Sequence, residues 1–162
     1  MSLLVKMNGG LIKMANFLVI ISMAAIAIVI PYEVFCRYVL NSMNTWSSEF
    51  CMYSLVWASM LGGAAGLSKG FQVGITSLID SLSKKNAKIL QGVIYVLILI
   101  FTAIMTFYGT FQVFANLRQT SSSMGISMSI PYAALPLGFF IMFTTTLEQL
   151  LELPGLQSGG RN

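Results

Sequence analysis

The sequence predicts an all-α membrane protein with four transmembrane helices and one amphipathic interfacial helix. Four segments run without a charged residue: 14–32, 50–68, 89–117 and 119–147. Each is long enough to cross a hydrocarbon core, which takes about 20 helical residues. Charged residues make up only 9% of the chain and hydrophobic residues 56%, whereas soluble domains average about 25% charged. These lengths and this composition both indicate a chain that lies in a bilayer.

The distribution of lysine and arginine predicts the orientation. The N-terminus, the second connection and the C-terminus carry seven basic residues: Lys6, Lys13, Lys69, Lys84, Lys85, Lys88 and Arg161. The first and third connections carry only Arg37 and Arg118. Because cytoplasmic loops are enriched in Lys and Arg, this asymmetry predicts a multi-pass protein of the bacterial inner membrane with both termini in the cytoplasm. The net charge of +4 is accounted for in this way and does not indicate nucleic-acid binding.

The first transmembrane helix is expected over about 14–36, beginning near Lys13. The apolar run continues past the small-residue pattern at 25–27, so an uncleaved helix is favoured over a signal peptide. Pro31 either bends this helix or begins a separate short turn. Glu33 and Arg37 are four residues apart and can pair on one helix face.

The second transmembrane helix is expected over about 47–68. Asn44 or Thr45 can cap it, which would place Glu49 in its first turn, where the helix dipole favours a carboxylate. Trp46 falls at the water–lipid boundary, where an indole ring is favoured. The pattern suggests that Arg37, Trp46 and Glu49 form one structural cluster near the outer face, with a charge pair inside this chain as the alternative.

Small residues at four-residue spacing end the second helix, at Gly62, Gly66 and Gly70. This spacing lets two helix backbones approach closely in lipid. It predicts a tightly packed face, whose partner is a helix of the same chain or of another.

Residues 71–83 predict the amphipathic helix, lying in the cytoplasmic interface. Apolar residues recur at helical spacing from Phe71 to Leu82, with polar residues elsewhere around the helix. A basic cluster follows, which consists of Lys84, Lys85 and Lys88 and is expected to contact lipid headgroups. The alternative is a polar loop that caps the bundle.

The third and fourth transmembrane helices are expected over about 89–117 and 130–152. The third exceeds the bilayer thickness, so it must tilt or project. A polar connection at 119–123 leads to a segment, 124–130, that is extended or forms a shallow turn. Pro154 and Gly155 end the fourth helix. The prediction is therefore one membrane domain over 1–153 with a flexible tail at 154–162.

No residue pattern of catalysis or metal binding occurs in this chain. It contains no histidine, and its ionisable residues map near the ends of the spans. Ion-coupled carriers usually place a charged or strongly polar group near the bilayer midplane, and the threonines in the spans are expected to bond back to their own helix. Cys36 and Cys51 match no metal motif and are expected to be free thiols, with a disulfide between them as the alternative. We therefore expect no catalytic residue and no cofactor, and neither a stand-alone transporter nor an intramembrane enzyme.

Five short motifs, in order, resemble the small membrane subunit of TRAP (tripartite ATP-independent periplasmic) transporters. They are Arg37-Tyr38-Val39-Leu40-Asn41, Trp46-x-x-Glu49, Trp57-x-x-x-Leu61-Gly62-Gly63-Ala64, Lys69-Gly70-x-x-Val73-x-Ile75 and Ile130-Pro131-Tyr132-x-x-x-Pro136-Leu137-Gly138. The chain departs from that family's usual pattern in three places. Ser48 precedes a single Glu49 where two acidic residues are common, and Gln72 and Thr76 stand where a histidine and an aspartate are common.

The resemblance implies a division of labour among three proteins. A periplasmic substrate-binding protein delivers an organic anion, and a large multi-helix permease subunit holds the sodium and substrate sites. The small subunit then acts as a scaffold for the large one in a sodium-driven symporter. On this reading the candidate interface residues are Arg37, Trp46, Glu49, Trp57, Gly62 and Gly66. The cargo, whether a dicarboxylate, a sialic acid or a sulfonate, is not encoded in such a subunit.

Two other classes of four-helix membrane protein remain as alternatives. A small multidrug exporter needs a carboxylate deep in its first helix for proton coupling, whereas Glu33 lies at the end of that helix. A membrane-embedded enzyme would need clustered arginines at the helix ends, where only Arg37 and Arg118 occur on the outer side. Both classes fit the residues less well than a transporter subunit does.

Overall fold

The computed structural model describes residues 2–42, 44–69 and 84–152, and within them the fold is all helical. The helices are α1 (Ser2–Tyr38), α2 (Thr45–Ser68), α4 (Lys84–Ala115), α5 (Ser129–Tyr132) and α6 (Ala134–Glu152). Four stretches are long and apolar enough to cross a membrane: Leu4–Tyr38, Thr45–Ser68, Asn86–Ala115 and Ser129–Glu152. The prediction of four transmembrane helices is confirmed. The predicted interfacial helix at 71–83 and the tail at 154–162 lie outside the described residues.

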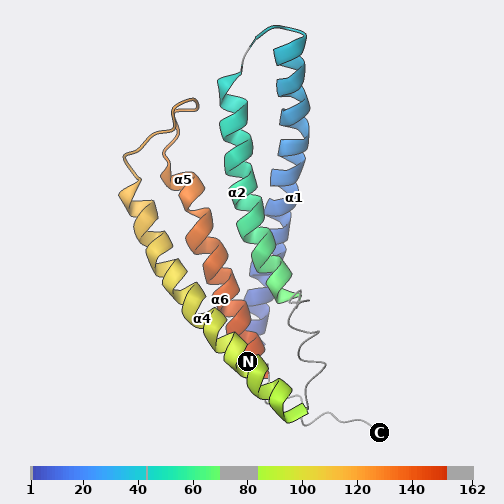
Figure 1. Cartoon of the computed structure of the whole chain (residues 1–162), viewed down its shortest axis with the longest axis vertical. Coiled ribbons are helices and arrows are strands. Elements are labelled where there is room, and N and C mark those ends of the chain that lie inside the picture. The colour runs from blue at the N-terminus through green and yellow to red at the C-terminus, as the bar shows by residue number, and fades with distance from the viewer. Residues whose placement is uncertain (1, 43, 70–83, 153–162) are drawn as a thin grey trace.

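The helices pack as two antiparallel pairs that meet at α2 and α6 (Figure 1). One pair is α1 with α2, the other is α4 with α6, and the two pairs diverge toward the upper end of Figure 1. That upper end carries the connections at 39–42 and 116–128, and we call it the loop end. At the opposite end, the terminal end, α1 begins and α6 finishes.

Small and medium-sized side chains form the core where α1, α2 and α6 meet. The buried cluster consists of Ala15, Leu61, Ala64 and Ile141. The α2 and α6 backbones approach closely at Gly138 of α6, where an added Cβ would stand 3.0 Å from Met60 Cβ and 3.2 Å from the Met60 carbonyl oxygen of α2. A glycine suits this position because a Cβ would push the two helices apart by a few tenths of an ångström.

The predicted glycine ladder on α2 does not mark the tightest packing. A Cβ added at Gly62 would meet Val19 Cγ2 of α1 at 3.9 Å, an ordinary contact, and one at Gly66 would meet nothing within 4 Å. Gly70 lies outside the described residues. Gly66 therefore makes no close contact within the described part of this chain, where the crossing of α2 with α6 falls at Met60, one to two turns earlier. The alternative that this face packs against a helix of another chain stays a prediction.

The first helix begins at Ser2 rather than near Lys13, and it runs through Pro31 to Tyr38 without a break. Its early turns are stabilised by a contact far away in the sequence. Asn8 is buried and donates hydrogen bonds to the Thr144 carbonyl oxygen at 3.0 Å and to the Glu148 carboxylate. These contacts with α6 extend α1 beyond the apolar segment that predicted it.

The other helix boundaries differ from the prediction by smaller amounts. Asn44 holds the N-cap position of α2, but its side chain makes no capping hydrogen bond. Glu49 is the fifth residue of α2, so the prediction that it lies in the first turn is wrong. The fourth span is divided at Ala133 into α5 and α6.

Candidate functional site

A carboxylate of α2 anchors the polar loop at the loop end of the bundle. This loop, 119–128, is called the serine loop below, and the Glu49 side chain of α2 points to it. The Glu49 carboxylate accepts hydrogen bonds from Ser121 Oγ, from Ser122 Oγ at 2.7 Å, from the Ser123 N–H at 3.2 Å and from the Met124 N–H at 3.2 Å. Four donor groups therefore converge on one side chain that lies 72 to 75 residues away in the chain.

The serine loop has a defined structure of its own. Thr120 and Ser127 form an antiparallel bridge, and the Ser121 N–H donates to the Ile126 carbonyl oxygen at 2.8 Å. Gly125 has a φ of +67°, a left-handed conformation that glycine adopts without steric penalty. The loop is thus a short hairpin. From the sequence we expected only an extended segment or a shallow turn over 124–130.

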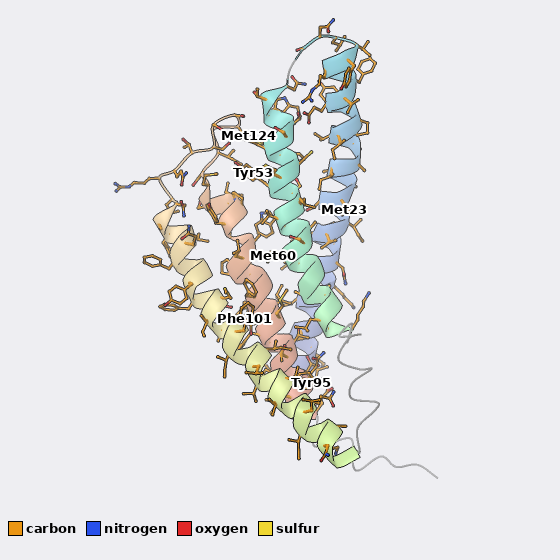
Figure 2. All side chains as sticks on the ribbon, viewed as in Figure 1. Met23, Tyr53, Met60, Tyr95, Phe101 and Met124 are labelled. Atoms are coloured by element: carbon orange, nitrogen blue, oxygen red, sulfur yellow. The ribbon has the colours of Figure 1, made fainter. Side chains whose placement is uncertain are left out.

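A second contact joins the serine loop to the same face of α2. Tyr53 lies four residues after Glu49, so both side chains project from one side of the helix. The Tyr53 hydroxyl lies 3.3 Å from the Met128 sulfur. Tyr53 of α2 and Met124 of the loop mark this junction in Figure 2. Hydrogen bonds to a charged acceptor are stronger than neutral ones, so Glu49 is the main anchor and Tyr53 a secondary one.

The three residues predicted as one outer cluster each have a different partner. Arg37 pairs with Glu33 at 3.1 Å, as the four-residue spacing predicted. Trp46 contacts Phe50 edge to face, with ring centroids 6.4 Å apart, and it is 39% exposed. Glu49 binds the serine loop. The Glu49 carboxylate holds the serine loop in place. Neither the Arg37 guanidinium nor the Trp46 indole takes part in that contact.

The remaining predicted site residues are dispersed over the molecule. Trp57 packs against the core cluster, and Gly62 faces α1. Lys88 is half buried on α4, whereas the side chains of the other two members of the basic cluster lie outside the described part. Cys36 and Cys51 are both free thiols, so the structure contains no disulfide between them.

Three threonines in the spans form hydrogen bonds within their own helices. Thr102 Oγ1 donates to the Ile98 carbonyl oxygen at 2.7 Å, and Thr106 Oγ1 donates to the Thr102 carbonyl oxygen at 2.7 Å. Thr146 bonds to its own helix in the same way. Among the described residues no group of three or more His, Cys, Asp or Glu side chains could hold a metal ion.

A wide apolar groove runs between α4 and α6. It has a volume of about 550 Å³, and five phenylalanines line most of it: Phe107, Phe111, Phe114, Phe140 and Phe143. Its two hydroxyls, on Thr106 and Thr110, donate to carbonyl oxygens of α4. The groove therefore offers apolar contact without a reactive group.

The sequence pointed to Glu49 but not to the hydrogen-bond donors that it contacts. It also gave no sign that α2 and α6 pack closely at Gly138. By itself the run of serines at 121–123 predicts only a polar connection. No local signal pairs it with Glu49, because the two segments are distant in sequence.

The comparisons with known proteins agree with this architecture. The model of the family "Tripartite ATP-independent periplasmic transporters, DctQ component" matches residues 12–154. The small permease protein SiaQ of the sialic acid TRAP transporter of Vibrio cholerae is 26% identical over 137 residues, which cover 85% of this chain and 79% of that protein. The chain thus belongs to the DctQ family: it is a small permease subunit of a TRAP transporter, a multi-pass inner-membrane protein and not an enzyme.

Proposed function

We propose that this chain is the scaffold subunit of a sodium-driven, binding-protein-dependent transporter for an organic anion. One observation carries the scaffold role: no charged side chain lies near the middle of any of the four spans, and the Thr102 and Thr106 hydroxyls there bond to their own helix. A carrier usually exposes a charged or strongly polar group near the midplane. The substrate and sodium sites are therefore assigned to the large permease subunit.

Membership in the DctQ family implies two protein partners, a large permease subunit and a periplasmic substrate-binding protein. With both termini in the cytoplasm, the loop end faces the periplasm. The Glu49-anchored serine loop and the half-exposed Trp46 would then lie where a periplasmic or membrane partner can contact them. We propose that this end helps to fix the chain to the large subunit, and that lipid headgroups contact the basic cluster on the cytoplasmic side.

Only the chemical class of the transported compound can be proposed from the comparison with a relative. The relative in Vibrio cholerae is part of a sialic acid transporter, and sialic acid is an organic anion. The identity is only 26%, and the proposed function places the substrate site in another subunit. We therefore do not assign sialic acid itself as the cargo of this transporter. An organic anion is therefore the proposed cargo class.

Reconstituted transport tests this function. Proteoliposomes that contain this chain and the large subunit, with the binding protein outside, should take up the labelled anion only when sodium is higher outside. Liposomes with this chain alone should show no uptake. Uptake by this chain alone, or equal uptake with a proton gradient in place of sodium, would overturn the proposal.

A second experiment separates a scaffold role from a direct role in transport. Trp46→Ala and Glu49→Ala should lower the yield of co-purified large subunit, and transport should fall in the same proportion. Ser123→Ala is the matched control, because Ser123 contacts Glu49 through its backbone N–H, which alanine retains. A Glu49→Ala complex that assembles fully but does not transport would show that the scaffold role is incomplete.

A further inference from the structure

A polar pocket at the terminal end has no role in the contacts described so far. It has a volume of about 260 Å³ and lies between the first turns of α1, the end of α2 and the last turns of α6. Six polar residues line it: Asn8, Ser68, Thr145, Glu148, Gln149 and Glu152. We call it the inner pocket.

Apart from the Thr145 hydroxyl, which can both donate and accept, the hydrogen-bond donors of the inner pocket are already used inside the chain. Asn8 Nδ2 donates to the Thr144 carbonyl oxygen and to Glu148. Ser68 Oγ donates to the Ala65 carbonyl oxygen at 2.7 Å, and Gln149 Nε2 donates to the Leu67 carbonyl oxygen at 3.0 Å. What remains in the pocket is mainly acceptor oxygen.

Two of those oxygens are buried without a partner. Thr145 is 3% exposed, and its Oγ1, like Gln149 Oε1, has no hydrogen-bond partner among the described residues. In native proteins the large majority of buried polar side-chain atoms are paired. Two unpaired oxygens beside a pocket lined by two carboxylates therefore indicate that something with hydrogen-bond donors binds there.

The charge of the lining and the size of the inner pocket indicate that its occupant is an organic cation. Glu148 and Glu152 both line the pocket, and no described basic side chain is part of the lining. The volume of about 260 Å³ is many times the roughly 30 Å³ that one water occupies in the liquid, so a bare metal ion would leave most of it empty. Val5 and Ile12 add an apolar wall, which suits the methylene stem of lysine or arginine.

We propose that the inner pocket receives a lysine or arginine side chain of the large membrane subunit. This inference rests on the proposed function, in which that subunit lies against this chain in the bilayer. The basic residues nearest in sequence to the lining are exposed and do not take part in it: Lys6, Lys13 and Lys69. A cation from a neighbouring chain would supply donors to Thr145 and Gln149 and a counter-charge to Glu148.

Neutralising one carboxylate tests this pairing. Glu148→Gln keeps an acceptor oxygen for Asn8 but removes the charge, and Glu33→Gln makes the same change at the opposite end of the molecule. The dissociation constant of the complex with the large subunit is measured in lipid nanodiscs. We expect Glu148→Gln to weaken the complex about tenfold, equivalent to about 1.4 kcal/mol, with Glu33→Gln near the wild-type value. Each variant also loses the charge of an intrachain pair, Asn8 with Glu148 or Arg37 with Glu33. Thermal unfolding of the isolated chain is therefore measured for both variants, and the dissociation constants are compared at a temperature at which both chains are fully folded.

The source of the cation is identified by replacing each lysine and arginine at the cytoplasmic end of the large subunit with glutamine. One replacement should weaken the complex as Glu148→Gln does, and the two together should be no worse than either alone. An unchanged dissociation constant for Glu148→Gln in a complex that assembles would overturn the inference and leave the proposed function standing. The inference would also be overturned if the effect of Glu148→Gln were lost in nanodiscs of phosphatidylcholine without phosphatidylethanolamine. That result would show that a lipid ammonium group occupies the inner pocket. If the wild-type chain forms no complex at all, both proposals fail.

Discussion

Gly138→Ala should destabilise the bundle more than the same change at Gly66. The new methyl group at position 138 would stand 3.0 Å from Met60 Cβ and 3.2 Å from the Met60 carbonyl oxygen, whereas at position 66 it would meet nothing within 4 Å. The neighbour at Gly138 is helix backbone, so α2 and α6 must move apart. Overpacking of this kind costs about 1–3 kcal/mol.

Comparing the two variants isolates the free-energy cost of overpacking at Gly138. Both glycines lie inside helices, so each alanine gains a similar helix propensity, up to about 1 kcal/mol, and that gain cancels in the difference. We expect Gly138→Ala to be about 1–3 kcal/mol less stable than Gly66→Ala, with Gly66→Ala at or above the wild-type stability. The free energy of unfolding is measured by adding sodium dodecyl sulfate to mixed micelles and following helicity.

The result that would refute this reasoning is a cost at Gly66 equal to or larger than that at Gly138. It would mean that the glycine ladder of α2 is the true contact face in the folded chain. Gly109→Ala provides a further check, because its Cβ would stand 3.2 Å from the backbone nitrogen of Pro136, and it should also lower the stability.

Three other predictions concern the loop end, the topology and the basic cluster. Glu49→Ala should raise amide hydrogen exchange in the serine loop by at least about tenfold, as measured by mass spectrometry, whereas Ser123→Ala should leave it unchanged; equal exchange in the two variants would contradict the anchoring role. A reporter inserted at Ser122 should be periplasmic and one fused after Asn162 cytoplasmic, and finding both on one side would exclude four spans. Replacing the basic cluster with glutamine should lower stability more in anionic-lipid membranes than in neutral detergent, each lysine contributing about 1 kcal/mol, and equal losses would favour the polar-loop alternative for 71–83.

Hydropathy predicted the four spans, and the structure confirms them. The spans follow from apolar length, which the membrane imposes on each helix separately. The pairing of Glu33 with Arg37 is also local, because a four-residue spacing brings the two side chains together in any helix. The back-bonding of Thr102 follows in the same way from its position in a lipid-buried helix.

Contacts between distant segments could not be predicted, and they explain the largest differences between prediction and structure. The extension of α1 to Ser2 depends on Asn8 meeting Thr144 and Glu148 of α6. The role of Glu49 depends on serines that local sequence describes only as a polar connection. The position of the closest helix crossing depends on how α2 and α6 are placed, which the spacing of glycines in one helix does not determine.

The packing of α4 has a consequence for how this protein is assembled during synthesis. Among the described residues α4 packs against α5 and α6 and against neither α1 nor α2. The first two helices can therefore pair as soon as both have left the ribosome, whereas α4 enters the bilayer before either of its partners has been made. A helix that is inserted into the bilayer before its packing partners must be stable there without them. Between Lys88 and Arg118 it carries no charged residue, and its threonine hydroxyls bond to its own backbone, so α4 meets that requirement until α6 arrives.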